Sequence, residues 1–192
     1  NNGANSLVSA ITKEVPFIHF IETDDYTNGR GIKTLYPYTQ VLIDSGSDLY
    51  LDNLIIPLVE TNLRGKVLNG SLIEVLKPEA LLLNVNIEFS NIYTVTDTRL
   101  ENIRLAFNRF FSTYKKINRE VLEDFIKTEL GVNELYIAGL TFTFTSPYVS
   151  EETFKLTDNY SDITIPKGRF LYLSSITKIL PLPLPRPPMA PT

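Results

Sequence analysis

Acidic side chains are the first group in this sequence whose spacing could support chemistry. Glu22, Asp24 and Asp25 stand close together, just before an Asn28-Gly29 pair. Carboxylates arranged in this way could bind a metal ion or act as half of a glycosidase pair. Asn-Gly is typical of turns, however, and we favour solvated loop carboxylates over a site. The alternative, a ligand-binding or hydrolytic α+β domain with an acidic loop site, stays open.

A second acidic series, Asp44, Asp48 and Asp52, has the four-residue spacing that makes side chains neighbours on a helix. Ser, Gly and Asp residues between positions 44 and 48 are typical of a turn, so capping and turn roles explain these carboxylates more simply. The series does not match an EF-hand, because no glutamate falls at the twelfth position of that loop.

Histidine and cysteine chemistry is almost excluded by composition. The chain has no cysteine and one histidine, His19, in the apolar context Phe17 to Ile21. Without cysteine there are no disulfides, thiolate nucleophiles or cysteine-ligated zinc sites. A lone histidine has no second histidine for a metal pair, so we expect a structural role. We predict no catalytic residue, no metal, no cofactor and no enzymatic activity.

Charge and hydropathy argue against nucleic acid and against a membrane span. The formal net charge is -4 and the pI is about 5.1. Basic residues between Arg99 and Arg119 are interleaved with acidic ones, which favours a solvated helix face over a phosphate-binding surface. No window approaches about 18 apolar residues, so no transmembrane helix is expected. The chain begins at Asn1 and not at methionine, so we expect a piece of a longer polypeptide.

The clearest predicted element is a helix that Thr96 or Asp97 begins and that continues to about Tyr114. Its apolar residues recur at three- and four-residue spacing and should face the core or a subunit interface: Leu100, Ile103, Phe107, Phe110, Phe111 and Tyr114. The opposite, polar face should hold Arg99, Glu101, Asn102, Arg104 and Asn108. A second helix should begin after Asn118 and end at Gly131.

The remaining elements are shorter helices and strands. Helices are expected near 5–14 and 51–62, with Pro57 as a kink or as the true first turn. Residues 83–89 alternate between apolar and polar, as in a half-buried strand. Other strands are predicted at 17–22, 35–43, 71–76, 135–145, 153–156, 163–165 and 169–179. Pro37 should confine its strand to a sheet edge.

Together these elements predict a mixed α+β fold, with an antiparallel or mixed sheet covered by a two-helix layer. Residues 71–145 should form one unit. We expect an N-terminal helix plus strand segment at 1–50, an α+β domain at 51–179 and an extended Pro-rich tail at 180–192. The six prolines of that tail favour polyproline II.

The element order from about residue 52 carries a resemblance to a known family. A helix over Asp52–Glu60 precedes a glycine turn, a strand ending near Pro78, and the alternating strand Leu83–Phe89. Two helices and a strand-rich end follow, with a final hairpin over Ile163–Leu173. This layout resembles the C-terminal part of the phage baseplate J-like family, which includes wedge proteins of contractile-tailed phages and related injection systems.

The resemblance implies a structural role, with no catalytic residue. The expected partners are other baseplate or tail subunits and copies of the chain itself, in a homo- or hetero-oligomer. The expected location is the virion, in a tail baseplate assembled in the host cytoplasm. An equivalent component of a bacterial contractile injection system stays an alternative.

Two segments are predicted to make those contacts, besides the loop at 24–34. The first, 147–161, holds Tyr148, Phe154 and Tyr160 among polar residues, a mixture favoured at interfaces. The second is the tail, where Leu182 and Leu184 alternate with prolines and could dock on another subunit.

Overall fold

The computed structural model of the chain describes residues 4–24, 33–64, 73–90, 95–131, 137–145, 162–179 and 188–191. The helices are α1 (Ala4–Glu14), α2 (Gln40–Ser45), the π-helix η1 (Leu51–Ile55), α3 (Ile56–Arg64), α4 (Asp97–Phe111) and α5 (Arg119–Leu130). The strands are β1 (His19–Asp24), β2 (Lys33–Tyr38), β3 (Ile73–Val75), β4 (Glu79–Phe89), β5 (Lys116–Ile117), β6 (Ile137–Thr145), β7 (Ile163–Thr164) and β8 (Arg169–Ile179). The fold is mixed α+β, as the sequence predicted.

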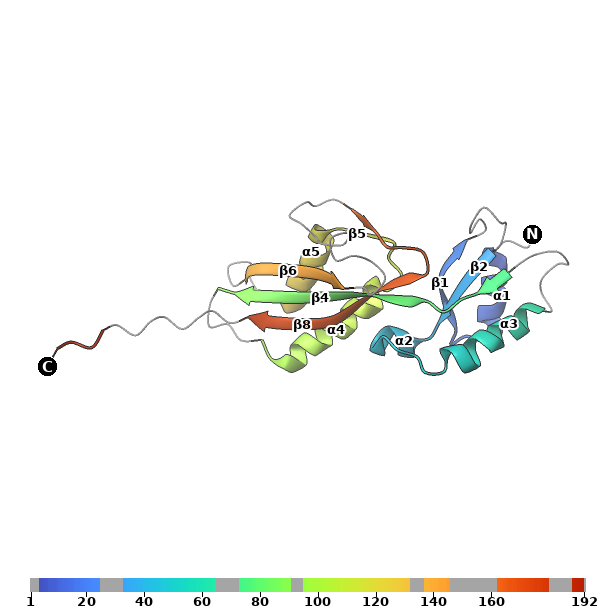
Figure 1. Ribbon diagram of the computed structural model, residues 1–192, viewed down its shortest axis with the longest axis horizontal. Coiled ribbons are helices and arrows are strands. Elements are labelled where there is room, and N and C mark those ends of the chain that lie inside the picture. The colour runs from blue at the N-terminus through green and yellow to red at the C-terminus, as the bar shows by residue number, and fades with distance from the viewer. Residues whose placement is uncertain are drawn as a thin grey trace.

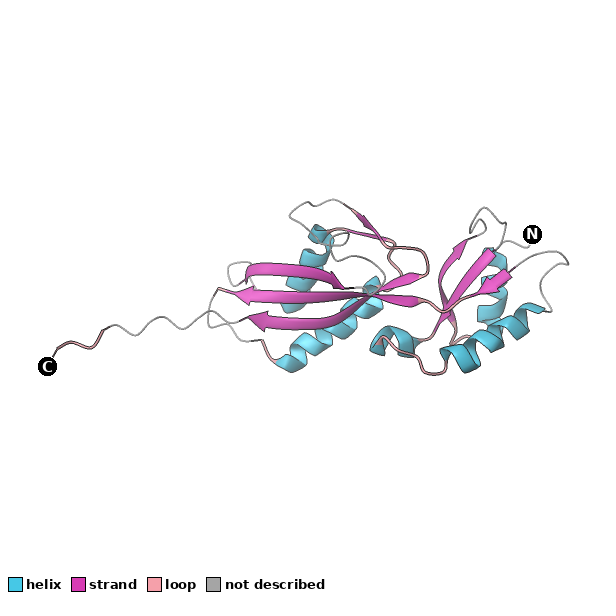
Figure 2. Ribbon diagram, viewed as in Figure 1, coloured by secondary structure: helices cyan, strands magenta, loops and turns pink. Residues whose placement is uncertain are grey.

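Two lobes lie side by side (Figure 1). The first lobe contains β1, β2 and β3 with α1, α2 and α3, and the second contains β4, β6 and β8 with α4 and α5. Strands β4 and β8 begin where the lobes meet and run together to the far end of the second lobe. Colouring by secondary structure distinguishes the sheet of β1, β2 and β3 and the sheet of β6, β4 and β8 from the helices beside them (Figure 2).

The main sheet of the second lobe has the order β6-β4-β8. Strand β4 pairs antiparallel with β6 and parallel with β8, so the sheet is mixed. The predicted strand at 83–89 extends back to Glu79. Its alternation is confirmed, because every second residue is buried: Leu81, Leu83, Val85, Ile87 and Phe89.

The caps confirm the predicted start of both helices of this lobe and the predicted end of α5, whereas α4 ends at Phe111 and not near Tyr114. The side-chain oxygen of Thr96 accepts a hydrogen bond from the Arg99 backbone, and that of Asn118 accepts one from Val121. Gly131 ends α5 in the left-handed region, with φ 64°. Helix α4 packs against β8, and both helices contribute to the buried cluster on that side of the sheet. A two-helix layer over the sheet stays a prediction.

Two positions on α4 differ from the predicted faces. Asn108, expected among the polar residues, is fully buried, and Phe110, expected among the apolar ones, is about half exposed. Asn108 is buried because α4 packs against a backbone segment of β8 that needs a polar partner. Its side chain donates to the carbonyl of Leu173 and accepts from the amide of Leu173.

The first lobe departs from the predicted strand at 35–43. Strand β2 ends at Tyr38, and Gln40–Ser45 form α2, which buries Leu42 and Ile43 on one side. Two neighbouring buried residues fit a helical face and a strand run alike, so the sequence pattern was ambiguous. Strand β2 is also the middle strand of the order β1-β2-β3 and not an edge. Pro37 is accommodated because the pairing with β3 involves only residues 33–35.

The segment around Pro57 follows the second of the two predicted alternatives. A π-helix, η1, covers Leu51–Ile55, and α3 begins directly after it at Ile56. Pro57 therefore stands in the first turn of α3, the part of a helix in which proline is tolerated best.

A second buried cluster contains residues from both sides of position 50, the end of the predicted N-terminal segment. It includes Ile18 and Leu35 from the N-terminal segment beside Leu51 and Val59. Strand β3 pairs with β2, so the predicted single unit at 71–145 is wrong at its N-terminal end. The two lobes are joined through β8, whose Phe170 and Tyr172 belong to this second cluster while Leu171 and Leu173 belong to the first.

Candidate protein-interaction surface

Most of the residues predicted to bind lie outside the described part of the chain. This holds for the interface candidates Tyr148, Phe154, Tyr160, Leu182 and Leu184, for the strand predicted at 153–156, and for Asp25. Glu22 and Asp24 lie in β1, but their side chains are outside the described part of the structure. The acidic loop and these contact segments therefore stay predictions.

The second acidic series does not converge. Asp48 is buried in the turn after α2, where it accepts hydrogen bonds from the Thr39 hydroxyl and from the Tyr50 backbone at 3.0 Å. Asp52 pairs with Lys77 at 3.0 Å on the surface. The turn role predicted for Asp48 is thereby confirmed. Within the described residues, no group of three or more His, Cys, Asp or Glu side chains could hold a metal ion.

Asp44, the first member of that series, connects the two lobes. Its carboxylate accepts two hydrogen bonds from the Arg109 guanidinium of α4, at 3.0 and 3.1 Å. This charge-assisted contact with Arg109 lowers the pKa of Asp44 below its ordinary value. The pair orients α2 against the C-terminal end of α4.

Several arginines of the predicted basic region bind acceptors of the chain itself. Arg99 donates to the last carbonyls of α5 at 2.6 and 3.3 Å, which satisfies that helix end. Arg104 binds both oxygens of Glu101, and this lowers the pKa of Glu101. Arg119 binds Glu123 and the Leu140 carbonyl. These contacts give the named arginines structural roles in the second lobe.

His19 lies at the start of β1 with an exposed side chain. Its ring stands 5.5 Å from the ring of Tyr38, centroid to centroid. Burial of the Tyr38 hydroxyl raises the pKa of Tyr38. The geometry is that of a cross-strand aromatic pair on β1 and β2.

An exposed apolar surface follows α2. The side chains of Leu49, Tyr50 and Leu54 are 83%, 68% and 56% exposed, and we call these three residues the π-turn patch. They alternate with Leu51 and Ile55, which are buried in the first-lobe cluster. The π-helical bond from the Ile55 amide to the Tyr50 carbonyl, at 3.1 Å, holds this arrangement. Large apolar side chains are thus presented to solvent by an anchored turn.

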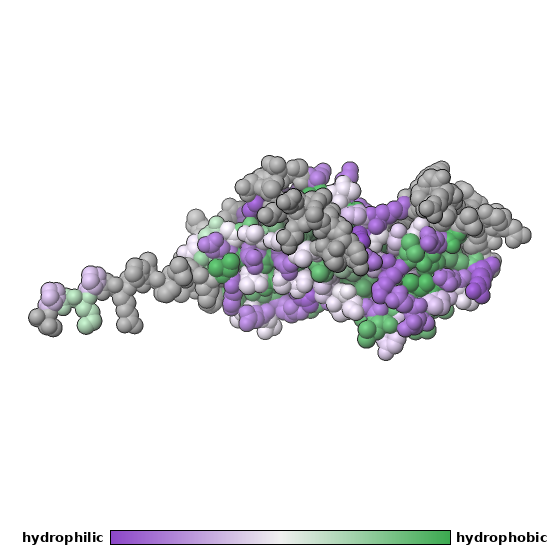
Figure 3. All heavy atoms as spheres, viewed as in Figure 1, coloured by the Kyte–Doolittle hydropathy of each residue, from purple (hydrophilic) through white to green (hydrophobic). Residues whose placement is uncertain are grey.

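In a regular helix over 51–62, Leu54 would fall on the same face as Leu51 and Ile55, yet its side chain is 56% exposed. A π-helix rotates its residues relative to α-helical spacing, so a 3.6-residue pattern places the side chains wrongly. The sequence does carry one signal of an exposed apolar surface, the run Leu49-Tyr50-Leu51. Three consecutive apolar residues cannot all lie on one buried stripe of a helix. Val41 on α2 is exposed as well, and Figure 3 shows apolar surface over that helix.

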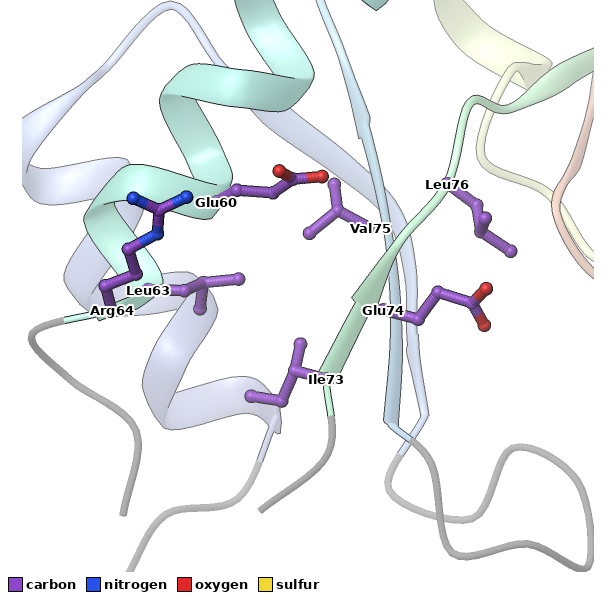
Figure 4. Close-up of a pocket in the computed structure, with 7 residues that line it drawn as sticks. All are labelled: Glu60, Leu63, Arg64, Ile73, Glu74, Val75 and Leu76. Atoms are coloured by element: carbon purple, nitrogen blue, oxygen red, sulfur yellow. The ribbon is translucent and has the colours of Figure 1, made fainter. Parts of the chain in front are cut away.

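A groove of about 590 Å³ lies between α3 and β3. Figure 4 shows Ile73 and Val75 pointing toward α3, where Leu63 lies, while Glu74 points to the other side of the strand. The carboxylates of Glu60 and Glu74 therefore do not converge on one point. The residues that connect the two walls, 65–72, are outside the described part. Among the described residues that line the groove, no acid, base and nucleophile are arranged for a reaction.

No family model and no curated protein matches this chain. Function must therefore be argued from the surface itself. None of the described helices has the length and apolar character that crossing a bilayer requires. Of the features above, the π-turn patch has the chemistry of a protein contact, because exposed apolar and aromatic side chains concentrate at interfaces.

Proposed function

We propose that this chain is a structural subunit of a large protein assembly, a wedge component of a contractile phage tail baseplate. The observation that supports this most is the π-turn patch of Leu49, Tyr50 and Leu54. Three large apolar side chains, all more than half exposed in adjacent turns, favour contact with another protein over contact with water. Helical segments with π geometry are also frequent at functional sites.

The patch is held in a defined shape before any partner arrives. Leu51 and Ile55 anchor it from below, and the buried Asp48 carboxylate binds the backbone of Tyr50. The Asp52–Lys77 pair ties η1 to the segment between β3 and β4. A surface held in this way loses little conformational freedom on binding, so more of its apolar burial contributes to affinity.

The baseplate assignment comes from the order of elements after residue 52. The alternating strand, the two capped helices and the closing β7 and β8 segment lie in the order that resembles the baseplate J-like family. Such subunits pair with copies of themselves or with relatives around a tail tube. The proposed location is accordingly the virion, and an equivalent place in a bacterial contractile injection system would use the same surfaces.

The test is incorporation into particles. A variant with Leu49→Ser, Tyr50→Ser and Leu54→Ser should remain folded, because these side chains are exposed, and should be lost from purified tails or injection particles. Phe17→Ser is the matched control, since Phe17 is a similarly exposed apolar residue of the same lobe. Circular dichroism checks folding, and quantitative mass spectrometry of particles measures copy number.

Incorporation of the triple variant at the wild-type copy number would contradict the role of the patch. Absence of the wild-type chain from every purified particle, with all of it recovered as a free monomer, would contradict the assembly function itself. Recovery in phage tails or in bacterial injection particles decides between the two locations.

A further inference from the structure

A second apolar surface lies on α4 and α5, in the other lobe. Phe110, Tyr114 and Val121 are 52%, 37% and 39% exposed. The ring of Phe110 stacks on Phe125 at 5.4 Å and stands 5.5 Å from Tyr114. We call Phe110, Tyr114, Val121 and Phe125 the aromatic patch. It forms one surface across two helices.

The aromatic patch is supported by core residues beneath it. Phe107 and Phe111 are fully buried, and both contact Phe125, at 5.6 and 5.1 Å between ring centroids. Phe110 also meets Phe111 edge to face at 4.8 Å. The exposed rings are therefore held by a packed aromatic cluster, and they can receive a ligand without rearranging.

The C-terminal tail has the composition that such a surface binds. Residues 180–192 contain six prolines, four of them at alternate positions from Pro181 to Pro187, with three leucines between or before these four. Proline-rich segments in the polyproline II conformation dock on exposed aromatic rings, because they are already extended and lose little conformational entropy on binding. The tail leaves the body at Ile179, the end of β8.

The charges of the tail and of α5 are complementary. Arg186 is the only charged side chain of residues 180–192. Glu120 and Asp124 are exposed on α5, next in sequence to Val121 and Phe125 of the aromatic patch. In a polyproline II helix, with three residues per turn, Leu182, Leu184 and Arg186 would occupy three different faces. Apolar faces can then cover the rings while the guanidinium approaches the carboxylates.

Ile179, after which the tail begins, and the aromatic patch lie at opposite ends of the second lobe. Helix α4 runs antiparallel to β8: Lys178 near the end of β8 pairs with Asp97 at the start of α4, at 3.4 Å. Phe110 is at the other end of α4, beside the Arg109 contact to the first lobe. Residues 188–191 are exposed, with Met189 at 93%, and lie apart from the body (Figure 1). The exposed position of residues 188–191, away from the body, favours a patch on another molecule as the binding site.

We propose that the C-terminal tail of one copy, residues 180–192, binds the aromatic patch of a second copy. The inference deepens the proposed function by naming one partner, the chain itself. At about 3.1 Å per residue, an extended tail of this length reaches roughly 40 Å, enough to join neighbouring subunits.

Because the chain has no cysteine, disulfide trapping can test this in the full-length protein. Chains carrying Val121→Cys are mixed with chains carrying Leu184→Cys under mild oxidation. The expected product is a cross-linked heterodimer of twice the 21.8 kDa chain mass. It should form about tenfold faster than with Val41→Cys in place of Val121→Cys, because docking raises the local thiol concentration. Val41 is a matched control, an exposed valine on α2.

Equal cross-linking by the Val41→Cys chain would overturn the proposal. So would an intramolecular disulfide as the dominant product of a Val121→Cys/Leu184→Cys double variant at high dilution, since the tail would then bind its own body. Neither result touches the proposed function, which is tested through the π-turn patch in particles.

A charge exchange gives a second measurement that introduces no cysteine. Arg186→Glu should weaken self-association in sedimentation equilibrium by about threefold, as for a surface ion pair. Mixing Arg186→Glu chains with Asp124→Lys chains should restore it. Unchanged association of both single variants, with no gain on mixing, would contradict the placement of Arg186 beside α5.

Discussion

The side chain of Asn108 binds both backbone groups of Leu173. Its amide nitrogen donates to the Leu173 carbonyl at 3.2 Å, and its amide oxygen accepts from the Leu173 N–H at 2.6 Å. The register between β4 and β8 is irregular between Leu83 and Asn84, opposite this point. Asn108 therefore satisfies the backbone N–H and carbonyl of Leu173, as a neighbouring strand would. The same two hydrogen bonds hold α4 against the sheet inside an apolar cluster.

Replacing Asn108 with leucine should destabilise the protein by about 1–3 kcal/mol, because the Leu173 N–H loses its partner in a buried site. The Leu173 carbonyl still accepts a hydrogen bond from Arg104 at 3.3 Å, so the main effect is that the Leu173 N–H is left without an acceptor. Urea unfolding followed by circular dichroism measures the change. Asn102→Leu, an exposed asparagine on the same helix, should stay within about 0.5 kcal/mol of wild type. Equal effects of the two variants would show that the Leu173 contact contributes nothing.

The aromatic cluster predicts a large difference between neighbouring phenylalanines. Phe107 is fully buried, and its replacement with alanine should cost about 3–5 kcal/mol through lost burial and a cavity. Phe110 is about half exposed, and Phe110→Ala should cost less than about half of that. Thermal and urea unfolding compare the two. A smaller loss for Phe107→Ala than for Phe110→Ala would contradict the assignment of Phe107 to the core.

Side-chain periodicity predicted the second lobe well, because its elements obey one period over many residues. The alternation in β4 and the caps at Thr96, Asn118 and Gly131 depend on local chemistry, which a sequence displays directly. Asn108 could not be placed in this way. Its burial depends on a backbone irregularity in β8, a segment distant in sequence, and no local pattern reports that.

The first lobe was harder to predict, since its elements are short and one has an unusual geometry. Leu42 and Ile43 fit a strand as well as the short helix α2 that they form. The exposure of Tyr50 and Leu54 depends on the π-helical register of η1, which has no simple sequence signature. In the sequence, the π-turn patch was therefore visible only as an excess of apolar residues, and its position on the surface came from the structure.

Gly168 should be far less tolerant of substitution than Gly131. Both have positive φ, 75° and 64°, so alanine strains the backbone at each. At Gly168 an added Cβ would also lie 2.6 Å from the Tyr36 ring, whereas at Gly131 the nearest atom is 3.4 Å away, at the tip of Arg99. Gly131→Ala should cost about 1 kcal/mol, and Gly168→Ala about 2–3 kcal/mol because steric overlap is added. Differential scanning calorimetry compares them. Equal losses would mean that Tyr36 moves aside freely.

The Asp44–Arg109 contact between the lobes should give a pH dependence of known sign. Arg109 lowers the pKa of Asp44 in the folded protein, while the unfolded chain has its ordinary value of about 3.9. A lowered folded pKa stabilises the protein at pH values above the unfolded pKa. That stabilisation disappears as the pH falls through the folded pKa and the carboxylate is protonated.

Arg109→Gln should therefore raise the pKa of Asp44, as followed by the chemical shift of its carboxyl carbon in NMR titration. The melting temperature of the variant should be slightly below that of wild type at pH 7, and the two should converge as the pH falls through the lowered pKa of Asp44. The gap should also shrink at about 1 M salt, because both side chains are accessible to solvent. Lys13→Gln removes an exposed positive charge from α1 and serves as control. An Asp44 titration identical in wild type and Arg109→Gln would show that the lobes are held together without this ion pair, through β4 and β8 alone.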